Sequence, residues 1–221
     1  MARYVQYGCG FSVPEGWMNF DSSPTLRAER TPFFGRFLTK NNLRFPDRVK
    51  IGNIVRGLPI EDSSADGVYA SHVLEHLTRA ELDTALRNTY RMLRPGGIFR
   101  LIVPDLEARV RRYIAKLETG EEHANDWFMT ATNLGLERRP TSIMGKLSRL
   151  AGGSMHLWMW DFSSLKAALE RAGFVSVRRC QLGDSGDPMF SLVEDPNRFH
   201  DGNEDISELA IQATKPHMAD Q

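Results

Sequence analysis

The chain has 221 residues, of which 41% are hydrophobic and 25% are charged, a balance typical of a soluble globular protein. Its 28 basic residues equal its 28 acidic residues, so no overall positive field is present to attract nucleic acid or a membrane surface. This length supports one sizeable core and is short for two, so we expect a single domain over residues 1–221.

No apolar run approaches the roughly 20 residues that span a bilayer. The segment Met1–Val5 lacks the apolar core of a signal peptide. The two cysteines, Cys9 and Cys180, lie far apart in the sequence, which is typical of free thiols in a reducing compartment. The sequence therefore predicts a cytoplasmic protein with no membrane partner.

Strand and helix patterns alternate along the chain. Strands are expected at 4–7, 17–20, 49–54, 66–71, 98–103, 174–180 and 209–214. Helices are expected over 33–45 and over 161–172. A further helix is expected to begin at a capping box formed by Thr78 and Glu81 and to end at Pro95-Gly96-Gly97. Alternation of this kind predicts an α/β protein with an open, mostly parallel sheet covered by helices on both faces.

Between residues 106 and 155 the alternation stops, and only helical patterns remain. We therefore expect residues 106–155 to form a helical insertion or cap after the fifth strand. Such an insertion would lie at the edge of the sheet, where it could choose the substrate.

Ligands of open α/β sheets bind beyond the carboxyl ends of the strands. Gly8 and Gly10 follow the first expected strand, and a turn without Cβ atoms lets a ligand approach the backbone. Asp21 ends the second strand, where a carboxylate can accept hydrogen bonds from both hydroxyls of a ribose. An ordinary turn or helix cap explains either feature alone, but together they favour a nucleoside ligand.

A dinucleotide-dependent dehydrogenase fits this pattern poorly. Its fingerprint needs a third glycine, where this chain has Val13, and an acid about 20 residues further on. Asp21 lies only 11 residues after Gly10. Pro14-Glu15-Gly16 also occupies the place of the helix that would hold a pyrophosphate.

Several motifs resemble S-adenosyl-L-methionine-dependent methyltransferases of the type 11-like kind, in the subgroup that joins its first two strands by a short loop. They are Tyr7-Gly8-Cys9-Gly10, Gly16–Asp21, Leu58-Pro59-Ile60, Ala70–Leu77 and Arg91–Gly97. The resemblance covers about residues 4–104 and resumes at 158–180. It implies a Rossmann-like fold with a seven-stranded sheet and S-adenosyl-L-methionine as the cofactor.

The resemblance also implies roles for individual residues. The methionine part of the cofactor would contact Tyr7, Gly8, Cys9 and Gly10, the ribose would contact Asp21, and Ser71 and His72 would lie beside the transferable methyl group. Asn53, with Ile54, occupies the place of an aspartate that accepts from the adenine amino group, a bond that an amide oxygen can also accept. Two departures, the missing third glycine and the missing first helix, leave open a catalytically silent binding or scaffold domain.

Methyl transfer requires alignment of the acceptor and, where the acceptor loses a proton, a general base. We take His72, Asp105 and His156 as the catalytic candidates, and expect a packing or capping role for His76. No spacing of His, Cys and Asp indicates a metal site. The predicted function is methyl transfer to a hydroxyl, amine or carboxyl of a small-molecule acceptor. A basic excess over Arg27–Lys50 suggests nucleic-acid methylation, but the zero net charge and the lack of an RNA-binding motif argue against it.

Overall fold

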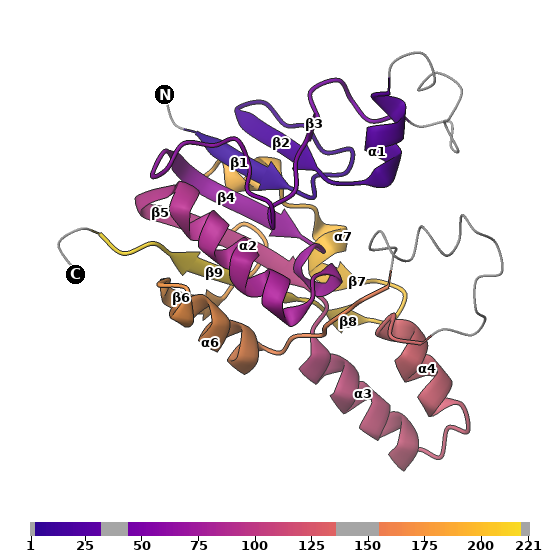
Figure 1. Cartoon of the computed structure of the whole chain (residues 1–221). Coiled ribbons are helices and arrows are strands. Elements are labelled where there is room, and N and C mark those ends of the chain that lie inside the picture. Colours follow the sequence, from indigo (N-terminus) through magenta and orange to yellow (C-terminus); the bar gives the residue numbers. More distant parts are fainter. Residues whose placement is uncertain (1–2, 32–43, 136–154, 218–221) are drawn as a thin grey trace.

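The computed structural model describes residues 3–31, 44–135 and 155–217. Seven of their strands form one large sheet, on which helices pack (Figure 1). Its strands are β1 (Tyr4–Tyr7), β2 (Trp17–Asp21), β3 (Lys50–Ile51), β4 (Ala65–Ser71), β5 (Leu93–Val103), β6 (Val175–Arg179) and β9 (Leu209–Thr214). A separate pair is formed by β7 (His200–Asp201) and β8 (Ile206–Ser207). The helices are α1 (Pro24–Glu29), α2 (Arg79–Met92), α3 (Leu106–Glu118), α4 (Ala124–Ala131), α6 (Phe162–Arg171) and α7 (Pro196–Phe199), with 3-10 turns η1 (Leu74–His76) and η2 (Phe190–Leu192).

The seven strands follow the order β3-β2-β1-β4-β5-β9-β6. The pairs from β3 to β5 are parallel, and β9 runs antiparallel to both β5 and β6. The expected mostly parallel, seven-stranded α/β sheet is therefore confirmed. The chain moves outward from β1 to β3 and then returns to β4, so the strand order reverses between β1 and β4. Their carboxyl ends flank the point at which open sheets of this kind bind ligands.

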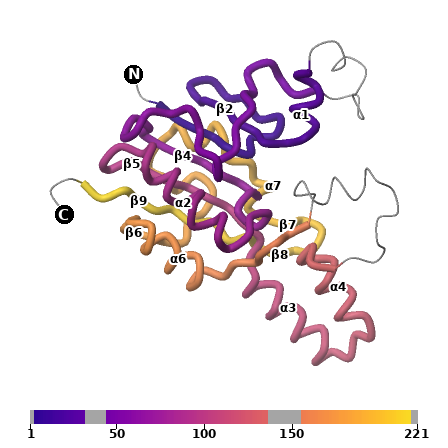
Figure 2. The backbone as a smooth tube through the Cα atoms, in the orientation of Figure 1, coloured from indigo at the N-terminus to yellow at the C-terminus, as the bar shows by residue number. Residues whose placement is uncertain are grey.

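Alternate residues of each central strand face opposite sides of the sheet. Phe99 and Leu101 of β5 belong to the larger core, which the apolar stripes of α2 and α6 complete. Both helices lie on the same face of the sheet (Figures 1 and 2). Among the described residues, α2 and α6 thus cover one face, while the second face carries the shorter helical elements η2 and α7.

The second face is covered by the segment between β6 and β7. Phe190 packs against the rings of Tyr4 and Trp17, with centroids 6.2 and 5.6 Å apart. The Tyr4 hydroxyl donates to Asp187 Oδ2 at 2.7 Å, and Trp17 Nε1 donates to the carbonyl of Met189 at 3.2 Å. This segment occupies the face left bare because β1 and β2 are joined by a loop without a helix.

A buried ion pair connects the segment between β6 and β7 to β5, in the middle of the sheet. Arg100 of β5 points to the second face, where its Nε donates to Glu194 Oε1 at 2.7 Å and its Nη1 to Asp184 Oδ1 at 2.9 Å. The side chains of Arg100 and Glu194 are each only 1% exposed. Removing one partner of such a pair leaves an uncompensated buried charge, which costs about 3–5 kcal/mol.

Most element boundaries agree with the sequence, and two need correction. The capping box is confirmed, since Thr78 Oγ1 accepts from the Glu81 amide and Glu81 Oε2 accepts from the Thr78 amide. The helix ends at Met92, before the expected Pro95-Gly96-Gly97, because Leu93 already pairs with Ala65 as the start of β5.

The expected strand 49–54 is limited to Lys50–Ile51. Asn53 ends it, because its Oδ1 accepts from the amides of Val55 and Arg56 and so closes a turn. The short helix α1 was not expected, although its Ser23 N-cap and the Pro24 that follows are ordinary start signals. Most of the expected helix 33–45 lies outside the described residues.

The described part of the expected insertion is the helix pair α3 and α4, which projects beyond the sheet (Figure 1). The rings of Tyr113 and Phe128 pack between the two helices, with centroids 5.2 Å apart. Residues 136–154 of the insertion lie outside the described residues. Among the helices that the structure describes, none is both long enough and apolar enough to cross a membrane.

Candidate functional site

The turn after β1 contains two glycines with different surroundings. Both adopt left-handed backbone angles, with φ of 66° at Gly8 and 54° at Gly10, which glycine adopts without steric cost. A Cβ at Gly8 would lie 2.1 Å from Val73 Cγ2, so packing alone explains this glycine. A Cβ at Gly10 would meet no atom within 4 Å. Gly10 therefore borders open space at the carboxyl end of β1, as a ligand-binding turn would.

Asp21 joins the ends of β1 and β2. Its Oδ2 accepts from the amide of Gly10 at 2.9 Å, and its Oδ1 accepts from the amide of Ser23 at 2.7 Å. The side chain is largely buried. Each carboxylate oxygen can accept a second hydrogen bond, so the geometry is compatible with a ribose as well as with a purely structural role.

The remaining cofactor candidates offer mainly their backbone. Tyr7 points into the core, its hydroxyl lies 3.3 Å from Thr89 Oγ1, and burial raises its pKa. Ile54 is also a core residue, and the side-chain oxygen Oδ1 of Asn53 accepts from two amides of its own turn. Cys9 is buried, which raises the pKa of its thiol to about 12. Of these four side chains, none is placed as a free polar contact for a ligand.

Ser71 ends β4 and His72 follows it, next to the end of β1. Ser71 Oγ is buried and has no hydrogen-bond partner. His72 has φ of 53°, a left-handed conformation that is uncommon outside glycine and is often kept at functional sites. This backbone turn directs the His72 ring away from the sheet, toward Glu75 and the carbonyl of Arg198.

Glu75 lies in η1 and is 1% exposed. The ring nitrogens His72 Nδ1 and His76 Nε2 lie 3.3 and 3.9 Å from Glu75 Oε1. Burial alone lowers the pKa of His72, but the nearby Glu75 carboxylate, with smaller effects of the Arg198 carbonyl and of Glu208, outweighs it and raises the pKa above its ordinary value. Glu75 therefore favours the charged form of His72.

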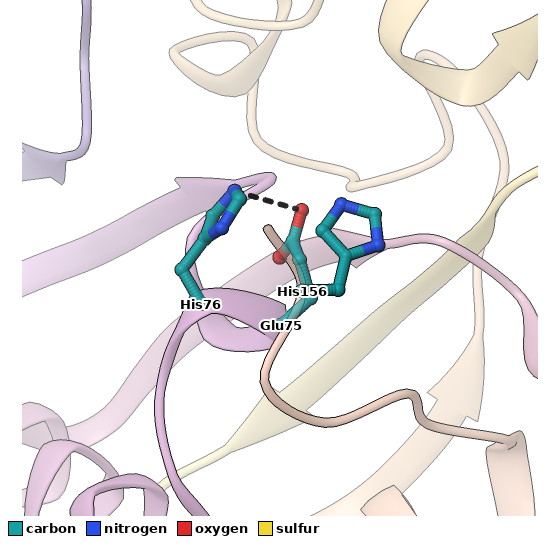
Figure 3. Close-up of side chains that lie close together, drawn as sticks. All are labelled: Glu75, His76 and His156. Carbon is teal, nitrogen blue, oxygen red and sulfur yellow. Dashed lines mark ion pairs between the residues drawn. The ribbon is translucent and has the colours of Figure 1, made fainter. Parts of the chain in front are cut away.

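His156 lies beside the Glu75 carboxylate, on the side opposite His76 (Figure 3). The amides of Leu157 and Trp158 donate to the carbonyl of Glu75 at 2.8 and 3.2 Å, which fixes this segment against η1. The rings of His156 and His76 pack edge to face, with centroids 5.1 Å apart. Burial lowers the pKa of His156, so its ring is neutral near neutral pH.

A polar cavity of about 550 Å³ lies beside these histidines. His72 and His156 line it together with Arg109, Asn133, Arg198 and His200, among others. Two of the three catalytic candidates thus share one cavity. The lining residues come from the end of β4, from α3 and α4, and from α7 and the segment that follows it.

Asp105, the third catalytic candidate, does not line this cavity. Its Oδ1 accepts from the amide of Glu107 at 2.9 Å as the N-cap of α3, and its Oδ2 pairs with Arg179 at 3.0 Å. Both oxygens therefore already stabilise the start of the helix pair, an arrangement that supports a structural role.

Arg109 lines the cavity and was not among the sequence candidates. It is 2% exposed and donates to both oxygens of Glu208, at 2.8 and 2.9 Å. Its Nε donates to the carbonyl of Ala131 at 3.0 Å. Arg109 therefore joins α3, α4 and the start of β9. An arginine near the start of an amphipathic helix gives no signal of this role, because its acidic partner lies 99 residues away.

Comparisons with known proteins agree with the observed fold. A family model described as a methyltransferase domain matches residues 33–101. The chain is similar to the crystal structure of a SAM-dependent methyltransferase from Archaeoglobus fulgidus, with 16% identity, a TM-score of 0.53, and coverage of 97% of this chain and 86% of that chain.

A second similar structure, from Thermotoga maritima, is described as a SAM-dependent methyltransferase and possible histamine N-methyltransferase. It has 17% identity, a TM-score of 0.49, and coverage of 97% of this chain and 82% of that chain. The search of curated proteins found no match. The fold is therefore that of S-adenosyl-L-methionine-dependent methyltransferases, as the sequence resemblance implies.

Proposed function

We infer that this chain, which has the fold of S-adenosyl-L-methionine-dependent methyltransferases, binds that cofactor and transfers its methyl group to a small-molecule acceptor. The observation that carries this proposal is the position of His72. This residue directly follows β4 beside the glycine turn of β1, and its ring lines the polar cavity. A cofactor at the strand ends and an acceptor in the cavity would therefore meet at one residue.

The residues at the strand ends fit the cofactor at three points. Gly10 borders open space, Asp21 has acceptor capacity left on both oxygens, and Ser71 Oγ is a buried hydroxyl without a partner. Backbone atoms of Tyr7, Cys9 and Ile54 would complete the contacts. S-adenosyl-L-methionine, when bound, supplies a methyl group already activated by its sulfonium charge.

The chain itself has to orient the acceptor and exclude water. Arg109 pairs with Asp201 and Glu208 and so holds the short pair β7–β8 in the lining of the cavity. The neutral imidazole of His156 can hydrogen-bond an acceptor hydroxyl or amine and take up its proton. Both ring nitrogens of His72 already face acceptors, the Glu75 carboxylate and the Arg198 carbonyl, so His72 would help to orient the acceptor without taking up its proton. The cavity is lined by arginine and histidine as well as by Asp201, Glu204 and Glu208, which favours an acceptor with polar groups.

Titration calorimetry of the full chain with S-adenosyl-L-homocysteine, the demethylated cofactor, tests the first half of the proposal. We expect submillimolar binding. The absence of heat at high ligand concentration would overturn the proposal and favour a catalytically silent domain.

Transfer from methyl-labelled cofactor to a panel of hydroxyl, amine and carboxyl acceptors tests the second half. His72→Ala should lower turnover more than it lowers cofactor affinity. His123→Ala serves as the matched control, because that histidine is exposed and lies outside the cavity. Equal turnover in both variants would remove His72 from the proposed reaction.

A further inference from the structure

Glu75 is a buried carboxylate without good hydrogen bonds. It is 1% exposed, and neither Oε1 nor Oε2 has a hydrogen-bond partner. A buried charge in this condition is costly unless a cation or several donors compensate it. The backbone around Glu75 is nonetheless fixed, since its carbonyl accepts from two amides of the segment that carries His156. The fold thus holds a buried anion in a defined place, with His72 Nδ1, 3.3 Å from Oε1, as a partly compensating neighbour.

His76 presents one nitrogen to this carboxylate. Its Nδ1 lies 3.0 Å from the carbonyl oxygen of Met155, and a carbonyl can only accept, so the proton lies on Nδ1. The lone pair of the neutral ring is then on Nε2, which lies 3.9 Å from Glu75 Oε1. A hydrogen bond from one ring nitrogen to a backbone carbonyl is the arrangement that orients histidine ligands of metal ions.

His156 supplies a buried nitrogen without a hydrogen-bond partner, its Nδ1. One ligand atom from each of Glu75, His76 and His156 lies within 4.8 Å of the others. Bonds of about 2.0–2.2 Å in a tetrahedral site separate two ligand atoms by about 3.4 Å. Rotation of the side chains that moves the ligand atoms together by roughly 1 Å would therefore close the triad around an ion.

The geometry points to a binding site for a divalent transition-metal ion formed by Glu75, His76 and His156 (Figure 3). Two imidazoles and one carboxylate are borderline ligands that suit zinc, iron or cobalt better than magnesium or calcium. Three protein ligands leave at least one coordination position open, as in catalytic zinc sites. Of the metals named, we assign zinc as the occupant to be tested first.

The open position has a neighbour of functional interest, because His156 also lines the polar cavity. An ion at the triad would lie at the edge of that cavity and within reach of an oxygen of its occupant. A role for the ion in acceptor binding rests on the proposed function. Metal binding itself does not, since it depends only on the three side chains.

Calorimetric titration of the metal-free full-length chain with zinc chloride tests the site. We expect one zinc ion per chain with a dissociation constant in the micromolar range or below. Glu75→Gln keeps the shape of the side chain and removes its charge. Loss of a residue that only hydrogen-bonds to a metal ligand weakens metal binding about 10–100-fold, and loss of the ligand Glu75 should weaken zinc binding more than that. His156→Ala should do the same, whereas His123→Ala should bind zinc as the unaltered chain does.

Thermal unfolding separates lost binding from lost folding. Zinc should raise the melting temperature of the unaltered chain. The stabilisation should grow with the logarithm of the ratio of the free zinc concentration to the dissociation constant. Folded Glu75→Gln should show no such rise. Cobalt bound to the unaltered chain should show the visible absorption of a site with imidazole ligands.

Two results would overturn the site: no saturable zinc binding by the unaltered chain, or binding by Glu75→Gln as tight as by the unaltered chain. The same preparation titrated with S-adenosyl-L-homocysteine reports the proposed function independently. Zinc binding without cofactor binding rejects only the methyl-transfer proposal, and the reverse result rejects only the metal site.

Discussion

The amide of Gly10 donates to Oδ2 of Asp21 at 2.9 Å. One carboxylate therefore fixes the glycine turn after β1 to the end of β2, across the edge at which a nucleoside ligand would bind. The conformation of the turn and the capacity to bind a ribose depend on the same side chain. A variant of Asp21 is accordingly the most direct probe of the cofactor site.

Asp21→Ala should weaken binding of S-adenosyl-L-homocysteine by about 1.5–3 kcal/mol, the usual contribution of hydrogen bonds to a charged group. Calorimetric titration measures this loss. Asp47→Ala removes an exposed carboxylate and controls for the change in net charge. An unchanged affinity in a folded Asp21→Ala chain would contradict the ribose assignment.

Gly10→Val should abolish cofactor binding, because its side chain would extend into the open space that the turn borders. Gly120→Val is a matched control. Gly120 has φ of 76° and also meets no atom within 4 Å of a built Cβ, but it follows α3, far from the glycine turn in the sequence. Both variants carry the strain of a left-handed valine. If both bind the demethylated cofactor normally, the turn does not face the ligand.

Arg109→Met should destabilise the protein by about 3–5 kcal/mol, because it leaves the charge of Glu208 buried without its partner. Urea unfolding measures the loss. The double variant Arg109→Met with Glu208→Gln removes both charges and should regain a large part of it. A loss below about 1 kcal/mol would show that the pair is hydrated and contributes as little as surface pairs do.

Both thiols should resist alkylation in the native protein at pH 8. Burial raises the pKa of Cys9 and of Cys180 to about 12, and only the thiolate reacts. Alkylation should become faster as the pH rises toward this raised pKa, because the fraction of thiolate then increases. Mass spectrometry after iodoacetamide treatment should show unmodified native chains and two modified cysteines in denatured ones. Rapid labelling of either thiol in the native state would contradict this expectation.

The sequence allowed the sheet to be predicted because its signals are local. The apolar strand at 98–103 and the capping box at Thr78 depend on neighbouring residues only, and both are present. The end of α2 was misplaced because Leu93 leaves the helix to pair with Ala65. This strand pairing ends the helix before the stop signal Pro95-Gly96-Gly97, and it cannot be predicted from the residues next to Leu93 in the sequence.

The candidate site was predicted less completely, because it joins distant segments. His72 and His156 were identified individually, and the cavity that brings them together is a property of the fold. The sequence pattern indicated no metal site, since His156 lies 80 positions after His76. Arg109 was missed for the same reason, as its partner Glu208 belongs to the other end of the chain.

The cover of the second face has a consequence for how the chain folds. Tyr4 and Asp187 are separated by 183 positions, so β1 and β2 remain half uncovered until the segment around Phe190 has left the ribosome. Contacts between such distant segments slow folding, because a long loop must close before they form. The nascent chain would meanwhile expose the rings of Tyr4 and Trp17, a condition that promotes aggregation and recruits chaperones.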